Sequence, residues 1–117
     1  MGNYYDCLYA ENDKSGFEIR FSVGYEDSHP KDFFDDSAYD IADMVDKIDR
    51  GVLSWFVARV DAYKNEILLA SDYLGANLYE NPMEFMKDGY YDDMKERVIE
   101  EAKQTIAKLT EDLHEKA

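Results

Sequence analysis

The side chains in this sequence that are most able to do chemistry are carboxylates. Aspartate and glutamate supply 27 of the 117 residues against 13 lysines and arginines, and the formal net charge is −14. Carboxylates can bind metal ions, transfer protons or attract a basic partner, depending on what surrounds them. One group lies between residues 35 and 49 and includes four aspartates spaced three residues apart; its members are Asp35, Asp36, Asp40, Asp43, Asp46 and Asp49.

A second group of carboxylates consists of Glu80, Glu84, Asp88, Asp92 and Asp93. Residues 26–50 and 80–96 together carry ten of the fourteen excess negative charges. A row of like charges on one helix face costs stability at low salt, so we interpret both groups as the contact surface for a basic partner. The other interpretation is that the acidic residues only keep the protein soluble.

Other chemistries have weaker support in the sequence. His29 and His114 belong to no recognisable catalytic signature, and Cys7 has no basic neighbour that would lower its pKa. The acidic residues around His29 lack the alternating spacing and central glycine of a calcium-binding loop. The glycines stand singly, so no phosphate-binding loop is present. We therefore predict no catalytic residue, no cofactor and no metal site.

The composition narrows the classes of function further. A sequence pI of about 4.3 disfavours direct binding to nucleic acid or to an anionic membrane. An aromatic content of 15% is too high for a disordered acidic tail. No apolar run approaches the roughly 20 residues of a membrane helix. A single cysteine and the lack of an apolar leader after Met1 favour a cytosolic protein.

The elements that must position these carboxylates follow from local patterns. Residues 17–25 alternate apolar and polar side chains, which predicts a half-buried strand paired with the aromatic segment 4–10 through a turn at 11–16. A helix is expected over about 38–50, with Ser37 as its N-cap and Gly51 as its stop. Its apolar stripe then faces away from the first group of carboxylates.

The second half of the chain repeats this order of elements. Two strands over 53–62 and 66–73 are expected, joined by a turn at residues 63–65. The run Asn81-Pro82-Met83-Glu84 starts a helix that breaks near Gly89 and continues to the C-terminus as an amphipathic stripe. The sequence thus predicts one α+β domain over residues 1–117 in ββαββα order, an antiparallel four-stranded sheet with helices packed on one face.

Two segments carry a resemblance to a known class of proteins. The run Val60-Asp61-Ala62-Tyr63-Lys64-Asn65-Glu66-Ile67 resembles a hairpin of ArdA-type antirestriction proteins, and the acidic helix start at 79–85 follows it at a similar distance. In size and acidity the chain is also similar to anti-CRISPR proteins. Both are small inhibitors of host defence that phages and plasmids carry.

The resemblance implies a non-enzymatic inhibitor that works in the host cytosol as a DNA mimic. Its partner would be a restriction or CRISPR nuclease complex, whose basic nucleic-acid groove the carboxylates would occupy. ArdA proteins contain several small domains in a row and dimerise into a curved surface. With length for one domain, this chain would need either a short target groove or a homodimer, formed through a sheet edge or the C-terminal helix.

Two other functions are compatible with the same sequence. An immunity or antitoxin protein that neutralises a basic toxin or nuclease would need a similar acidic surface. An enzyme that uses tyrosines and carboxylates around Trp55 and Tyr73 would need a deep pocket with converging polar groups.

Overall fold

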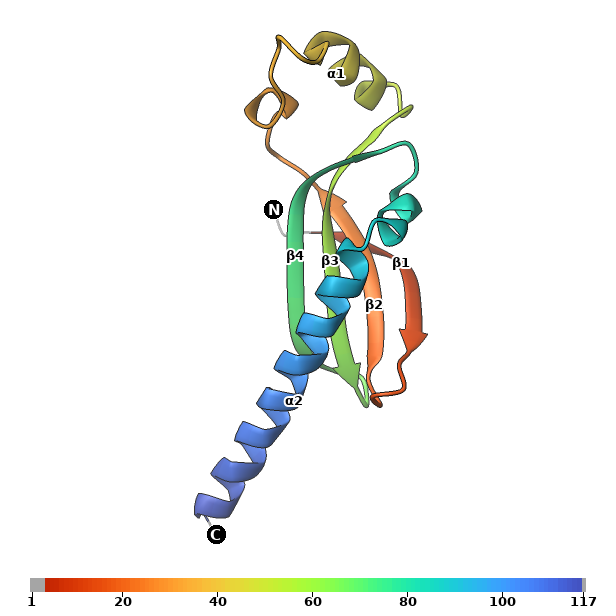
Figure 1. Ribbon diagram of the computed structural model, residues 1–117. Helices are drawn as coiled ribbons and strands as arrows, with labels where there is room; N and C mark the ends of the chain where they lie inside the picture. Colours follow the sequence, from red (N-terminus) through yellow and green to blue (C-terminus); the bar gives the residue numbers. More distant parts are fainter. Residues whose placement is uncertain (1–3, 117) are drawn as a thin grey trace.

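The predicted α+β fold is confirmed by a computed structural model that describes residues 4–116, with the side chains of residues 4–111 (Figure 1). Four strands form one sheet in the order β1-β2-β3-β4, and each neighbouring pair is antiparallel. The elements follow the expected ββαββα order: β1 (Tyr5–Asn12), β2 (Glu18–Tyr25), the 3-10 helix η1 (Pro30–Asp32), α1 (Ile41–Asp49), β3 (Ser54–Lys64), β4 (Ile67–Tyr79), the 3-10 helix η2 (Pro82–Lys87) and α2 (Tyr90–Lys116).

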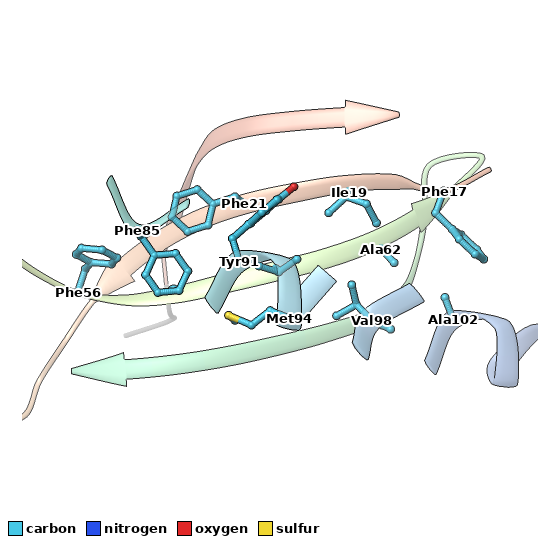
Figure 2. Packing of buried hydrophobic residues seen from close by; sticks show 13 residues of the cluster. Phe17, Ile19, Phe21, Phe56, Ala62, Phe85, Tyr91, Met94, Val98 and Ala102 are labelled. Atoms are coloured by element: carbon cyan, nitrogen blue, oxygen red, sulfur yellow. The ribbon is translucent and has the colours of Figure 1, made fainter. Parts of the chain in front are cut away.

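The hydrophobic core lies between α2 and one face of the sheet (Figure 2). Alternation along β2 and β3 places Ile19, Phe21 and Val60 on this face, and all three are buried. Helix α2 covers them with residues spaced three or four apart, including Met94 and Val98. The amphipathic stripe predicted for this helix is therefore the one that builds the core.

The 3-10 helix η2 closes the same face beside the start of α2 (Figure 1). The predicted start is confirmed, because the Asn81 side chain accepts from the Met83 N–H while Glu84 accepts from the Asn81 N–H. Phe85 on η2 stacks on Phe21 with ring centroids 5.4 Å apart. The break at Gly89, where φ is +86°, separates η2 from α2.

Strand β4 is longer than the sequence patterns indicate. It was expected to end at residue 73 and instead runs to Tyr79, past an irregularity where Ala76 has a φ of +59°. The Glu26 carboxylate accepts the Ala76 N–H at 2.6 Å. The side-chain amide of Asn77 donates to the carbonyl oxygens of Phe56 and Leu74. The pairing of β3 with β4 therefore continues beyond the bulge.

The turn between β3 and β4 is also displaced from its expected place at residues 63–65. Residues Asn65 and Glu66 form it, with φ values of 51° and 67°. Two positive φ values in sequence match the right-handed twist of the flanking strands, which explains why so short a turn suffices.

Helix α1 begins at Ile41, three residues later than expected. Its N-cap is Asp40, whose carboxylate accepts the Asp43 N–H, whereas Ser37 lies in a preceding turn and donates its N–H to Asp35. The predicted stop at Gly51 is confirmed by a φ of +78°. Figure 1 shows α1 beyond one end of the sheet and the C-terminal part of α2 extending past the other. None of the helices among residues 4–116 is long and apolar enough to cross a membrane.

Candidate functional site

All eleven predicted contact carboxylates are exposed in the structure. They form two groups that differ in the elements that carry them. The α1 group lies on the turn before α1 and on α1 itself, and it consists of Asp35, Asp36, Asp40, Asp43, Asp46 and Asp49. The η2 group follows β4 and continues over η2 into the first turn of α2, and it consists of Glu80, Glu84, Asp88, Asp92 and Asp93.

Two members of the α1 group form ion pairs along the helix. Lys47 Nζ lies 2.9 Å from Asp43, and Arg50 Nε lies 2.9 Å from Asp46. Both pairs are well exposed, so each contributes at most about 0.5 kcal/mol. Residues 35–50 still hold six acidic and two basic residues, which leaves this segment with a net charge of −4.

Other members of the α1 group hold the local backbone in place. Asp40 caps α1, and the Ser37 N–H donates to Asp35 at 2.9 Å. The hydrogen bonds from Ser37 lower the pKa of Asp35, which keeps this carboxylate ionised. Asp36 and Asp49 take no part in a hydrogen bond or ion pair among the described side chains, so their charge faces solvent.

The η2 group is also partly explained by local structure. Glu84 completes the cap of η2, and Asp88 accepts the Tyr79 hydroxyl at 2.6 Å. Burial, together with this hydrogen bond, raises the pKa of Tyr79. Asp92 and Asp93 lie in the first turn of α2, where the helix dipole favours negative charge.

Two basic residues lie near the η2 group: Lys87 in the last turn of η2, and Lys95 on α2, which pairs with carboxylates outside the group. Lys95 extends toward β1 and the turn after it, where its ammonium lies 2.9 Å from Glu11 and 3.0 Å from Asp13. Glu11 also accepts the Tyr91 hydroxyl at 2.5 Å. Lys95 therefore neutralises carboxylates at the sheet edge rather than those of the η2 group.

A cavity of about 570 Å³ lies next to the α1 group at the end of the sheet, and no carboxylate of the η2 group lines it. Its walls come from several elements: Val45 and Ile48 from α1, Trp55 from β3 and Pro82 from η2. Asp49 of the α1 group lines the same cavity. Sequence reasoning missed this cavity, because it depends on where α1 stands relative to the sheet.

An aromatic cluster next to the α1 group was missed as well. It consists of Phe33, Phe34, Tyr39 and Trp55, with ring centroids 5.0–6.2 Å apart. Phe33 and Tyr39 remain 58% and 51% exposed. Phe33 and Phe34, adjacent in an otherwise polar stretch, were the sequence signal that could have revealed this cluster.

The residues of the alternative enzyme site, around Trp55 and Tyr73, lie apart in the structure. Trp55 lines the cavity, whereas Tyr73 packs against Tyr5 on the opposite face of the sheet from α2, where Arg59 lies near both rings. The structure thus does not join Trp55 and Tyr73 in one pocket. Among the described residues, no three histidine, cysteine or carboxylate side chains are grouped so that they could hold a metal ion.

Comparison of the chain with protein-family models, with curated proteins and with solved structures gives no match. The functional interpretation therefore rests on the geometry and charge of the site.

Proposed function

We propose that this protein is a non-enzymatic acidic inhibitor that occupies the basic nucleic-acid groove of a nuclease in a host defence complex. The observation that carries the proposal is the exposure of all eleven carboxylates on two short segments, residues 35–50 and 80–96, each of which keeps a net charge of −4 after its basic residues are counted. We place the inhibitor in the cytosol, where such complexes act.

The spacing of the carboxylates suits the mimicry of phosphates. Three residues on an α-helix advance about 4.5 Å along its axis, and the phosphates of one DNA strand follow each other about every 3.4 Å. The nine residues of α1 extend about 13 Å, which corresponds to roughly four base pairs. A single copy therefore matches a short basic groove rather than a long duplex track.

The proposal is tested by competition for DNA on a panel of purified restriction, CRISPR and toxin nucleases. Each nuclease is bound to a fluorescent duplex, and the inhibitor is titrated in while anisotropy reports the bound DNA. We expect the inhibitor to displace the duplex from at least one nuclease and to remain uncleaved itself. A panel on which DNA binding is unaffected would contradict the proposal.

A charge-matched pair of variants separates surface recognition from net charge. The test variant carries Asp36→Asn, Asp49→Asn and Glu80→Gln, three exposed carboxylates with no cap or ion pair among the described side chains. The control carries Glu66→Gln, Glu101→Gln and Glu111→Gln, which removes the same charge from exposed positions elsewhere. We expect the test variant to lose about tenfold or more in affinity and the control to lose much less. Equal losses of affinity in the two variants would mean that binding depends on net charge alone and not on the α1 and η2 groups.

A further inference from the structure

We infer that the cavity beneath α1 receives a bulky apolar side chain from a cationic segment of the partner. This inference rests on the proposed function, because it names a contact that the proposed partner makes beside Asp49 of the α1 group. It concerns the roughly 570 Å³ hollow at the end of the sheet, which is lined by α1, β3, β2 with the loop after it, and Pro82 of η2. Ligand pockets in proteins have volumes of about 300–1,000 Å³.

The apolar side of α1 is only partly used by the fold itself. Ile41 and Met44 are buried, whereas Val45 and Ile48 are half-buried and line the cavity. Among the other helices and strands, α1 has its most extensive contact with η1. Because the hollow is open to solvent, Val45 and Ile48 leave apolar area on the stripe of α1 that another molecule can cover.

The wall opposite α1 is rigid and apolar. The indole N–H of Trp55 donates to the Ser28 carbonyl at 2.9 Å, so its hydrogen-bonding capacity is already met. Aromatic contacts with Phe33 and Phe34 hold the same ring from the outside. A preformed wall lowers the entropic cost of binding.

The charged groups around the cavity select the kind of side chain that enters. Glu26 and Asp49 are its acidic lining residues, and no lysine or arginine lines it among the described residues. Glu26 is already held by the Ala76 and Ser28 N–H groups, whereas Asp49 is exposed at the surface of α1. An apolar side chain flanked by lysine or arginine can pack against the apolar lining residues while the flanking cation lies near Asp49. A flanking carboxylate would be repelled.

The single tryptophan of the chain makes the site directly observable. Trp55 lines the cavity, and selective excitation of its indole reports occupancy. Three pentapeptides serve as probes: phenylalanine between pairs of arginines, alanine between pairs of arginines, and phenylalanine between pairs of glutamates. We expect the first to shift the Trp55 emission and to bind about tenfold or more tightly than the second, since burial of a phenylalanine ring is favourable. The third should not bind.

A substitution that fills the cavity gives the matching control on the protein. Val45→Phe should abolish the advantage of phenylalanine over alanine, because the new ring takes its place. Val52→Phe, at an exposed position outside the cavity lining, should preserve it. If Val45→Phe does not fold, methyl chemical shifts of Val23 and Leu53 in the unmodified protein report entry of the peptide.

The outcomes separate this inference from the proposed function. Equal affinity for the two arginine peptides, or unchanged methyl signals, would overturn the cavity assignment and leave the acidic surface as the binding site. Failure of both arginine peptides to bind at low salt would contradict the cavity assignment and the acidic contact surface together. Equal binding of the glutamate peptide would overturn the charge selectivity of the rim.

Discussion

At the scale of single residues, Glu26 is the carboxylate that supports the unexpected extension of β4. Its side chain accepts the Ala76 N–H at 2.6 Å and both the N–H and hydroxyl of Ser28. We expect Glu26→Ala to lower the free energy of unfolding by about 1–3 kcal/mol, because the Ala76 N–H loses a charged acceptor. Denaturant unfolding measures this change. Glu96→Ala, at an exposed position on α2, should stay within about 0.5 kcal/mol of the unmodified protein.

The contribution of Glu26 also depends on pH. Burial raises its pKa, but hydrogen bonds from Ser28 and Ala76 outweigh burial, and the pKa is lowered overall from the usual 4.5. The unfolded chain therefore takes up a proton more readily, and the stabilisation is present above pH 4.5 and lost as the pH falls through the pKa of the folded state. The stability difference between the unmodified protein and Glu26→Ala should shrink on acidification. A difference that grew would refute this role.

Two residues before α1, Ser37 and Asp40, are of types that cap helices, so the N-cap of α1 can be tested by substitution. The structure assigns the cap to Asp40, which accepts the Asp43 N–H at 3.1 Å. We expect Asp40→Ala to cost about 1 kcal/mol of local stability, seen as faster amide exchange in α1. Ser37→Ala should leave exchange in α1 unchanged, and the reverse pattern would restore the sequence-based assignment.

At the scale of elements, α2 shows how one helix divides into a structural and a protruding part. Met94 and Val98 are buried against the sheet, whereas Leu109 is 55% exposed. Met94→Ala should therefore reduce the free energy of unfolding by about 2–5 kcal/mol. Leu109→Ala should change it by less than about 0.5 kcal/mol. Similar losses at both positions in denaturant unfolding would mean that the outer part of α2 packs on something else.

Which elements could be predicted depended on how far away their partners lie in the sequence. The alternation of 17–25, the stripe of α2 and the Asn81 cap are local, and they were predicted correctly. The extension of β4 depends on Glu26, which is 50 residues from Ala76. The aromatic cluster joins Phe33 to Trp55, and the cavity depends on how α1 is placed. The acidic segments could be predicted because the charge of a segment follows from its own residues and does not depend on tertiary contacts.

At the scale of the whole molecule, the net charge of −14 opposes folding, because the exposed carboxylates repel one another. Repulsion among exposed carboxylates is screened by salt, whereas the exposed ion pairs contribute little. We therefore expect the Tm to rise as salt is added at neutral pH, which differential scanning calorimetry can follow. A Tm that fell would mean that the ion pairs outweigh the repulsion.

The central claim is that the carboxylates of the α1 and η2 groups are recognised by a cationic groove. Its most direct test is the affinity of the protein for a nuclease from which it displaces DNA, measured by calorimetry between about 50 and 200 mM salt. We predict that the Kd rises steeply across this range, by about tenfold or more, as ion contacts are screened. An affinity that stays constant over the same range would contradict the electrostatic account.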